Sequence, residues 1–340
     1  MTRQLFGTTD DGIAVTELRL ALASGMTASI LDRGAALRDL QVPVPEGLRR
    51  VVLGYRDLAG YVADAHYLGV VNGRHANRIA GSGFELDGIV YRPTLNEHGR
   101  THLHGGEVGF GRKQWRVLAH EDASATLGLT SPAGDEGYPG TVEARCTYRL
   151  VAPSTLSIEM SATTDAPTII NLAHHAYFTF ADGRPVRDHL LQVDASRYTP
   201  VDADLIPTGE IAPVAGTPYD FRSLRPIGNP SLASDFAYDI NFVLDRAGAG
   251  LSRAATLAAP DRTLWMEVFT TEPGIQLYDG SYLGPSHPGL DGKPHFRHAG
   301  LCLEPGKFPD GPNHQNFPSA VLRPSEIYRQ ITEYRFKNIA

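Results

Sequence analysis

The sequence predicts an all-β fold, a sandwich or a barrel built from many short strands. Three observations support this prediction. Apolar and polar residues alternate in several segments, as is typical of half-buried strands. The chain contains 35 Gly and 24 Pro in 340 residues, spread evenly, which indicates frequent turns. No window longer than about three turns combines helical apolar spacing with plausible caps, so we expect few or no long helices.

In the first part of the chain, two segments are expected to form strands. Thr16–Ile30 has the composition of a strand along its whole length. Phe84–Tyr91 (FELDGIVY) contains two short apolar runs on either side of Asp87-Gly88. Asp-Gly readily adopts the positive φ angles of a type I′ turn, so the second segment predicts a β-hairpin.

The clearest alternation lies near the middle of the chain, in Thr141–Leu150 (TVEARCTYRL). One face of this segment would carry Val142, Ala144, Cys146, Tyr148 and Leu150. After Ala152-Pro153-Ser154 the alternation resumes with Leu156, Ile158, Met160 and Ala162. The two runs are therefore expected to pair as antiparallel strands.

The remaining segments continue the same pattern. Thr168–Phe180 begins with a core strand, and Thr263–Thr271 (TLWMEVFTT) is also predicted to be a strand. Leu205–Pro230 is rich in Pro and Gly and is expected to form a long surface loop or hairpin, anchored by Tyr219, Phe221 and Leu224. No fixed repeat and no linker-like segment is visible, so a propeller or β-helix is not expected. We expect residues 1–340 to form one continuous domain.

Composition and charge exclude several classes of protein. With 20% charged and 42% hydrophobic residues, disorder, collagen and coiled coil are excluded. The net charge of -7 and the lack of a basic block argue against nucleic acid or an anionic membrane as partner. Two cysteines, Cys146 and Cys302, cannot build a disulfide framework or a thiolate zinc site, and they suit a reducing compartment. No run resembles a signal peptide or a membrane span, so a soluble cytoplasmic protein is expected.

Two of the four segments that mix polar and apolar residues contain arginine or histidine. In Gly69–Ala80, Asn77-Arg78 lies among small residues and Ile79, where a guanidinium must be paired or face a cleft. Arginine is suited to fixing sugar hydroxyls or carboxylates, and a salt bridge at a strand end is the alternative. Asn96–Gly106 holds three histidines, His98, His102 and His104. His102 and His104 are two residues apart, so on a strand they would share one face, as metal ligands can. The alternative interpretation of this segment is a polar loop.

The other two segments place titratable groups after apolar runs. A core strand runs into His174-His175, and because neighbouring residues on a strand point to opposite faces, only one of them can face a given cleft. The imidazole pKa lies near neutrality, which suits proton transfer. Glu304 follows another apolar run, which Pro305-Gly306 is expected to end, so it would stand at the end of a buried strand. A carboxylate in that place is either paired, here with Lys307 or a distant Arg, or has its pKa raised by desolvation. Paired carboxylates and carboxylates with a raised pKa are both common at active sites.

Several common catalytic motifs are missing from the sequence. There is no Gly-x-Gly-x-x-Gly or Walker-type loop, so nothing supports a nucleotide cofactor. There is no Gly-x-Ser-x-Gly elbow for a serine nucleophile, and neither cysteine has an activating context. What remains is histidine plus carboxylate, which indicates proton transfer to and from a neutral polar substrate.

Seven segments, in this order and spacing, resemble the aldose 1-epimerase (galactose mutarotase) family. They are VVLGYRDLAGY (51–61), GRHANRIAGSGFELDGIVYRPTLNE (73–97), LHGG (103–106), NLAHHAYF (171–178), YDINF (238–242), EPGIQLYDGSYL (272–283) and CLEPGKFPDGPN (302–313). The resemblance covers essentially the whole chain. It implies a large antiparallel β-sandwich of the galactose mutarotase-like type, with few or no long helices and the sugar in a cleft on one sheet.

The resemblance also implies roles for individual residues. His175, rather than His174, would give a proton to the sugar ring oxygen, and Glu304 would be the base. Substrate-positioning roles carry over to Asn77, Arg78, His104, Tyr177, Asp239 and Gln276. No metal and no cofactor is implied. The sequence departs from the family pattern at His174, where Asn is common, and at Pro305-Gly306, where a polar pair is frequent.

The implied substrate is a small aldose, with galactose and glucose the first choices, and the implied assembly is a monomer or homodimer. Three other functions stay open at this point. Asp239 and Glu304 could form the carboxylate pair of a glycoside hydrolase or lyase, about 5 to 9 Å apart and with His175 turned away. The chain could be a catalytically silent carbohydrate-binding module. A metal-dependent enzyme could use His102, His104 and His175.

Overall fold

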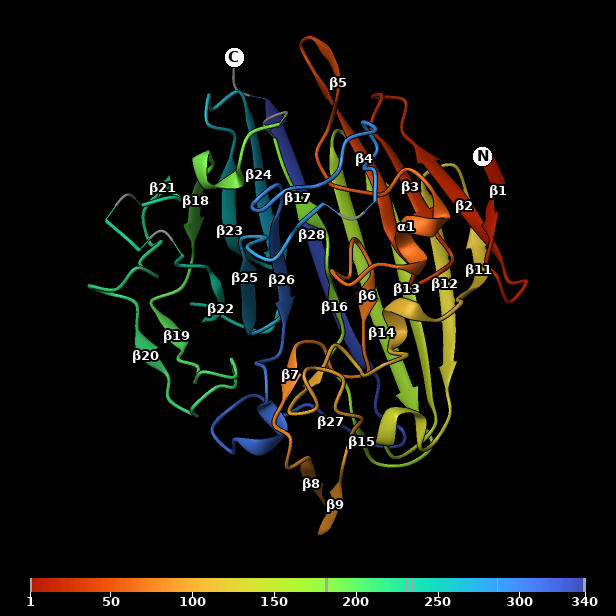
Figure 1. The fold of residues 1–340 in the computed structure, drawn as a ribbon, viewed down its shortest axis with the longest axis vertical. Helices are drawn as coiled ribbons and strands as arrows, with labels where there is room; N and C mark the ends of the chain where they lie inside the picture. The colour runs from red at the N-terminus through yellow and green to blue at the C-terminus, as the bar shows by residue number, and fades with distance from the viewer. Residues whose placement is uncertain (1, 181–182, 230, 234, 286, 339–340) are drawn as a thin grey trace.

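Antiparallel sheets form the framework of the computed structural model, which describes residues 2–180, 183–229, 231–233, 235–285 and 287–338. The largest sheet has nine strands (Figure 1). In spatial order these are β11 (Arg116–His120), β12 (Ser124–Ser131), β13 (Val142–Val151), β14 (Thr155–Thr164), β28 (Tyr328–Asn338), β24 (Leu264–Thr270), β23 (Ser252–Ala258), β18 (Leu190–Val193) and β21 (Arg225–Pro226). Strand β28 lies in the interior of this sheet and pairs with β14 on one side and β24 on the other.

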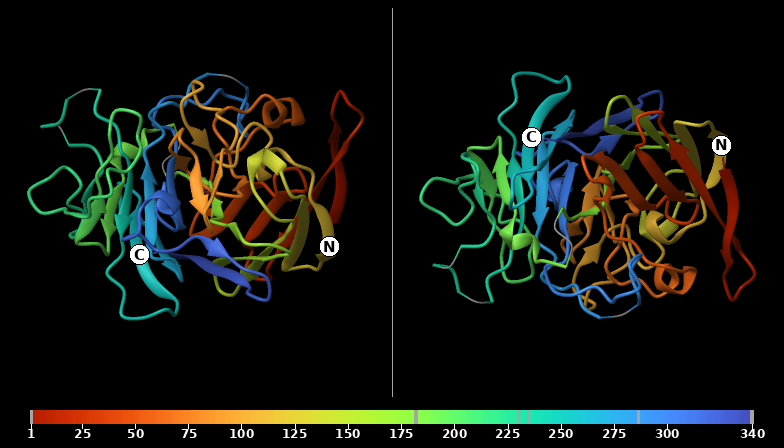
Figure 2. Two further views of the ribbon diagram at one scale, coloured as in Figure 1. Left: turned by 90° about the horizontal axis from the view of Figure 1, so that it is seen from below. Right: turned by 90° about the horizontal axis from the view of Figure 1, so that it is seen from above.

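Two further large sheets complete the framework. A six-stranded sheet contains β17 (Tyr177–Phe178), β26 (Leu301–Gly306), β25 (Gly274–Tyr278), β22 (Asp239–Val243), β19 (Arg197–Thr199) and β20 (Ala212–Pro213). A five-stranded sheet contains β1 (Thr2–Thr8), β2 (Ala14–Ala21), β3 (Thr27–Leu31), β4 (Leu37–Val44) and β5 (Gly47–Arg50). Figure 2 shows, in agreement with Figure 1, that the N-terminal strands and the strands of residues 190–260 lie on opposite sides of the molecule.

Short elements connect the large sheets. Four two-stranded pairs are β6 (Val71–Asn72) with β16 (Ala173–His174), β7 (Arg78–Ile79) with β10 (His102–Leu103), β8 (Phe84–Leu86) with β9 (Ile89–Tyr91), and β15 (Thr168–Ile169) with β27 (Val321–Leu322). The described helices are α1 (Leu58–Val62) and the 3-10 turns Phe110–Arg112, Asp135–Gly137, Val186–Asp188 and Gly311–Asn313. None of these helices is long and apolar enough to cross a membrane.

The predicted strands are largely confirmed. Strand β13 pairs with β14 in antiparallel register, and its alternate side chains from Val142 to Leu150 are buried as predicted. The β8–β9 hairpin turns at Asp87 and Gly88, whose φ angles are 52° and 80°. The prediction of one strand over Thr16–Ile30 is wrong, because the chain reverses between β2 and β3. The Leu205–Pro230 segment is mostly loop, with Phe221 buried, and it contributes only the short strands β20 and β21.

One hydrophobic cluster joins the three large sheets into a β-sandwich. It contains Leu18 and Ile30 from the five-stranded sheet, Cys146 from the nine-stranded sheet, and Ile275 and Leu303 from the six-stranded sheet. Burial of this apolar surface is the main force that holds the sheets face to face. The described part of the chain thus has the predicted all-β architecture.

Strands β25 and β26 are buried on both faces, and this is what positions the site. Every residue of both strands is buried. Side chains alternate along a strand, so Leu303 and its partner Leu277 pack into the core, while Glu304 and its partner Gln276 point to the opposite side. The strand continues through Pro305-Gly306, so the prediction that Glu304 stands at the strand end is wrong by two residues.

Candidate active site

A pocket of about 400 Å³ opens on the outer face of β25 and β26. Seven of the eight predicted site residues line it. They are Asn77, Arg78, His104, His175, Tyr177, Asp239 and Glu304. They come from β7 and the residue before it, from the loops after β10 and β16, and from β17, β22 and β26, so segments that are far apart in the sequence converge here.

Glu304 and His175 form a buried contact in the pocket. Oε1 of Glu304 lies 3.5 Å from Nε2 of His175, and both side chains are only 5% exposed. His175 follows β16, which pairs with β6, and the carbonyl of His175 accepts a backbone hydrogen bond from Gly69. The prediction that only one of the adjacent histidines faces the cleft is confirmed. His174 instead packs its ring 5.7 Å from that of Tyr148 in the core.

Burial shifts the proton affinities of this pair in opposite directions. Desolvation disfavours the charged form of each group. It lowers the pKa of His175 to about 4. Burial, and secondarily the negative charge of Asp239, raise the pKa of the Glu304 carboxyl well above its usual range. Both shifts therefore favour a proton on the carboxyl beside a neutral imidazole.

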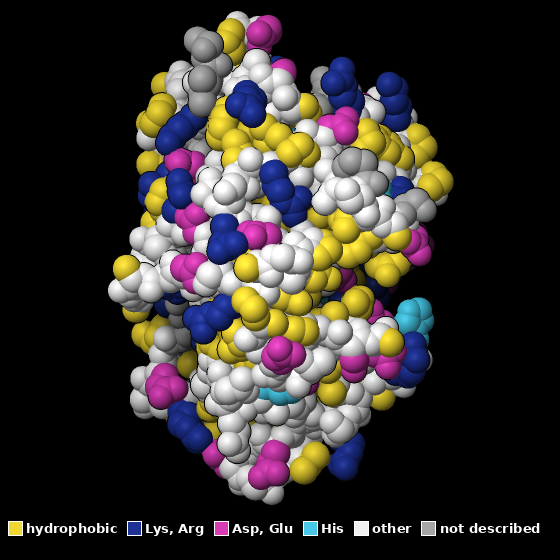
Figure 3. All heavy atoms as spheres, turned by 90° about the vertical axis from the view of Figure 1, so that its left-hand side faces the viewer, with side chains coloured by type: hydrophobic (Ala, Val, Ile, Leu, Met, Phe, Trp, Pro, Cys, Tyr) yellow, Lys and Arg dark blue, Asp and Glu magenta, His cyan; other side chains and the backbone are white. Residues whose placement is uncertain are grey.

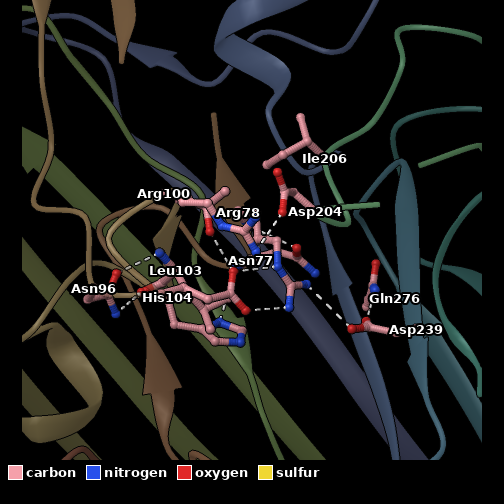
Figure 4. A network of polar contacts seen from close by, with 12 residues as sticks. Asn77, Arg78, Asn96, Arg100, Leu103, His104, Asp204, Ile206, Asp239 and Gln276 are labelled. Atoms are coloured by element: carbon pink, nitrogen blue, oxygen red, sulfur yellow. Dashed lines mark hydrogen bonds and ion pairs between the residues drawn. The ribbon is translucent and has the colours of Figure 1, made fainter. Parts of the chain in front are cut away.

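Arg78 is held between two carboxylates at the pocket wall (Figure 4). Its Nε and Nη2 each donate a 2.8 Å hydrogen bond to Glu97, and its Nη1 lies 3.4 Å from Asp239. Burial opposes the guanidinium charge, but Asp239 and Glu97 more than compensate and raise the pKa of Arg78. Both sequence-based interpretations of Arg78 thus hold, because it is salt-bridged and it also faces a cleft.

His104 and Asn77 form a second wall. The backbone N–H of Asn77 donates to Nδ1 of His104 over 3.1 Å, so the proton of the neutral imidazole is on Nε2. Burial, with the neighbouring His175, lowers the pKa of His104 well below its usual value. Asn77 and His104 have φ angles of 62° and 50°, and such backbone strain gathers at functional sites.

The resemblance implies that Tyr177 and Gln276 position the substrate, but the polar groups of both side chains bind other groups of the protein. The Tyr177 hydroxyl donates to the carbonyl of His66 over 2.9 Å, and its ring packs 5.1 Å from that of His175. Gln276 does not line the pocket, and its amide donates to Asp239 over 2.6 Å. Figure 4 shows this order, with Gln276 behind Asp239 and Asp239 facing Arg78.

The histidines do not converge on one point in the way a metal site requires. Leu103 ends β10, and His104 leaves the strand with a positive φ angle, so the prediction that His102 and His104 share one strand face is wrong. His102 points away, with its ring nitrogens bonded to the Thr94 carbonyl and the Tyr138 hydroxyl. Within the described residues, the cluster with possible ligand spacing is His175, Cys302 and Glu304.

Several pocket residues were not predicted from the sequence. Glu97 accepts a hydrogen bond from Arg78, and the ring of Tyr67 packs 4.5 Å from that of His104 at a tilt. Tyr278 lies opposite Cys302 in the β25–β26 pairing. At the mouth, an ion pair of 3.0 Å joins Arg100 to Asp204 (Figure 4). Glu97 and Tyr278 fall inside the segments that resemble the family, so a family alignment could have found them. Nothing in the sequence brings residues 100 and 204 together.

The molecular surface carries no single dominant charge on the face shown in Figure 3. Lys and Arg side chains are interspersed there with Asp and Glu side chains, and hydrophobic side chains gather in patches between them. Inside the pocket, Arg78 is balanced by Glu97 and Asp239. This distribution suits an uncharged polar ligand held by hydrogen bonds rather than an anion held by charge.

Comparison with known proteins places the chain in one family. The family described as Aldose 1-epimerase matches residues 17–335. The aldose 1-epimerase of Escherichia coli is 37% identical over 336 residues, covering 96% of both chains. The human galactose mutarotase is 36% identical over 345 residues, covering 99% of this chain and 98% of the relative.

Solved structures agree with the sequence relatives. The aldose epimerase homologue of C. elegans superposes with a TM-score of 0.91 at 30% identity, covering 96% of this chain and 100% of that one. Galactose 1-epimerase from Lactobacillus acidophilus superposes with a TM-score of 0.86 at 25% identity, covering 100% of this chain and 99% of that one. The chain belongs to the aldose 1-epimerase family.

Proposed function

We propose that this isomerase interconverts the α and β anomers of a neutral aldose, with Glu304 as the base and His175 as the acid. The observation that carries the proposal is the buried contact of 3.5 Å between Glu304 Oε1 and His175 Nε2 at the floor of the pocket. Anomer exchange needs one group to take a proton from the anomeric hydroxyl and another to give a proton to the ring oxygen. These two oxygens sit on one carbon, so the acid and the base must be close together.

The proton count of the cycle balances within the pair. In the reactive form Glu304 is a carboxylate and His175 is doubly protonated. Glu304 takes the proton of the anomeric hydroxyl while Nε2 of His175 gives its proton to the ring oxygen, and the bond between the anomeric carbon and that oxygen breaks. Rotation of the aldehyde exposes its other face, and the reverse transfers close the ring. The pair ends with the single shared proton with which it began, and no redox step is involved.

The substrate hydroxyls would be bound by a polar wall of the pocket, formed by Arg78, His104 and Asp239. Arg78 offers a guanidinium fixed in place by Glu97, and His104 offers Nε2–H as a neutral donor. Asp239 offers a carboxylate whose position is set by Gln276. Relatives named galactose mutarotase make galactose the first candidate substrate and glucose the second.

The test of this function is polarimetry with a panel of freshly dissolved aldoses. We expect the purified enzyme to accelerate the approach to the anomeric equilibrium for α-galactose and α-glucose. Xylose, arabinose, a sugar acid and a phosphorylated hexose complete the panel. Tight sugar binding without acceleration would identify a silent binding module instead. The hydrolase alternative is disfavoured, since it requires His175 to be turned away from Glu304, and the two are in contact.

The turnover number is expected to be constant over a broad range of pH and to fall at both ends. Below pH 4 a second proton enters the pair, because the pKa of His175 is about 4, and Glu304 can no longer accept. At alkaline pH the pair loses its last proton, and this limb follows the raised pKa of Glu304. Polarimetry from acid to alkaline pH, corrected for the uncatalysed reaction, measures both limbs. A profile that rises through the ordinary histidine pKa of 6.5 and shows no alkaline limb would contradict the assignment.

Replacing Arg78 with alanine is expected to raise KM by roughly 10- to 100-fold, since a hydrogen bond from a charged group to the sugar is lost. The turnover number should change much less, because Arg78 makes no contact with a transferred proton. The variant should also melt at a lower temperature, as Glu97 and Asp239 lose their buried partner. Michaelis kinetics and a thermal melt check both effects. An unchanged KM with a collapsed turnover number would show that Arg78 acts in the chemical step.

We further propose that residues 1–340 work as one cytoplasmic domain. The proposed site draws on residues from Asn77 to Glu304, and the main hydrophobic cluster extends from Leu18 to Phe336. Both Cys146 and Cys302 are free and buried thiols, which fits a reducing compartment.

A further inference from the structure

The imidazole of His175 is contacted at both ring nitrogens by side chains of one strand. Glu304 lies 3.5 Å from Nε2, and Sγ of Cys302 lies 3.4 Å from Nδ1. Cys302 and Glu304 are alternate residues of β26, so both point to the same face of the sheet. The two contacts therefore orient the ring as a rigid unit.

Aromatic rings enclose the rest of the imidazole. The ring centroids of Tyr177 and His104 each lie 5.1 Å from that of His175, and that of Tyr67 lies at 6.1 Å. These neighbours restrict tilting of the ring but do not decide which nitrogen carries a proton. That choice depends on the partners at the two ring nitrogens, which are the Glu304 carboxyl and the Cys302 sulfur.

The direction of the hydrogen bond at Nδ1 follows from the group at the other ring nitrogen. Nε2 faces the carboxyl of Glu304 over 3.5 Å, and burial favours a proton on that carboxyl and a neutral imidazole. A protonated carboxyl donates, so Nε2 accepts, and the one proton of the neutral imidazole is on Nδ1. Nδ1–H then points to the Cys302 sulfur, 3.4 Å away, which acts as the acceptor.

The thiol keeps its proton in this environment. Burial, followed by the charge of Glu304, raises the pKa of Cys302 well above its usual value. A neutral thiol is a weak acceptor, whereas a carboxylate in the same place would hold a charged imidazole strongly and make it a poorer acid. The group at Nδ1 thus orients the ring with little effect on its acidity.

We propose that Cys302 is a positioning residue whose sulfur accepts Nδ1–H of His175, so that Nε2 is the nitrogen that exchanges its proton with the sugar. This proposal rests on the proton-transfer function proposed above. Its structural content is the hydrogen bond from Nδ1–H of His175 to the Cys302 sulfur, opposite the contact of Nε2 with Glu304. This bond keeps a proton on Nδ1 before and after Nε2 gives up its proton.

The experiment is nitrogen NMR of the histidine rings in labelled, substrate-free enzyme at neutral pH, with His175→Asn used to assign the signal. We expect a protonated Nδ1 and an unprotonated Nε2 in the wild type. Cys302→Ser should keep this tautomer, because a hydroxyl can accept and donate in the same places. Cys302→Ala should give a mixture of tautomers and a turnover number lower by roughly 3- to 10-fold at unchanged KM.

The second cysteine provides the matched control. Cys146 is an equally buried thiol on β13 in the hydrophobic core, so Cys146→Ala should leave the tautomer and the turnover number unchanged. A wild-type ring protonated at Nε2 overturns the proposal, as does a Cys302→Ala enzyme with wild-type tautomer and turnover. If Cys302→Ala does not fold, the tautomer of His175 in the wild-type enzyme alone tests the proposal. Because the tautomer is measured without sugar, its outcome is independent of whether Glu304 and His175 catalyse anomer exchange.

Discussion

Glu304→Gln is expected to lower the turnover number by on the order of 100- to 10,000-fold. Glutamine has nearly the volume of glutamate and can fill the same place on β26, but an amide cannot accept the proton of the anomeric hydroxyl. The Michaelis constant should change little, since the polar wall around Arg78 and His104 stays in place. Polarimetry of fresh α-galactose or α-glucose measures the loss.

Glu272→Gln is the matched control for this variant. Glu272 is also 5% exposed, and burial also raises its pKa, but it does not line the pocket. The same chemical change at this position should leave turnover close to that of the wild type. Near-full activity in Glu304→Gln would remove Glu304 as the base, whereas equal losses in both variants would indicate a general effect of neutralising a buried carboxyl.

His175→Asn should cause a loss of similar size, on the order of 100- to 10,000-fold, because the proton donor to the ring oxygen disappears. Asparagine keeps a polar side chain in the pocket but has no group that titrates. The acid limb of the pH profile, which follows the pKa of His175 near 4, should vanish together with the activity. The residual rate and its dependence on pH are both accessible by polarimetry.

His174→Asn tests the neighbouring position. The ring nitrogens of His174 have no hydrogen-bonding partner among the described residues, and the ring packs against Tyr148 rather than facing the pocket. The variant places asparagine where the family commonly has it. We expect it to keep most of the wild-type activity, and a loss as deep as that of His175→Asn would reverse the assignment of the two histidines.

The sequence predicts the fold well because the β-sandwich depends on local alternation. Val142 to Leu150 alternate strictly, and the structure buries the apolar set. The prediction fails at Thr16–Ile30, where the chain reverses around Ser24-Gly25, between β2 and β3. Ser-Gly favours a turn, and Gly25 has a φ angle of 94°, so the sequence does carry a turn signal within this strand-like segment. Side-chain periodicity indicates that strands exist, while a single short turn signal between two strand-like runs is easily taken as part of one strand.

The candidate site, like the fold, is predicted only in part from the sequence. The family resemblance identifies His175 and Glu304, whose side chains have distinctive chemistry. Glu97 and Cys302 also lie in segments that resemble the family, but the resemblance does not say which groups they contact. Glu97 binds Arg78, and Cys302 faces Nδ1 of His175. Both contacts join residues that are far apart in the sequence, so they become visible only in the folded chain.

The central position of β28 has a consequence for how the protein is made. This strand, Tyr328–Asn338, joins the β11–β14 half of the nine-stranded sheet to the half that contains β23 and β24. Until it emerges from the ribosome, β14 and β24 each present an unpaired edge, and such edges readily associate with other chains. The sheet on which the pocket-bearing strands rest therefore closes only after residues far beyond Glu304 have been synthesised. Chaperone engagement during translation should be greatest in that interval.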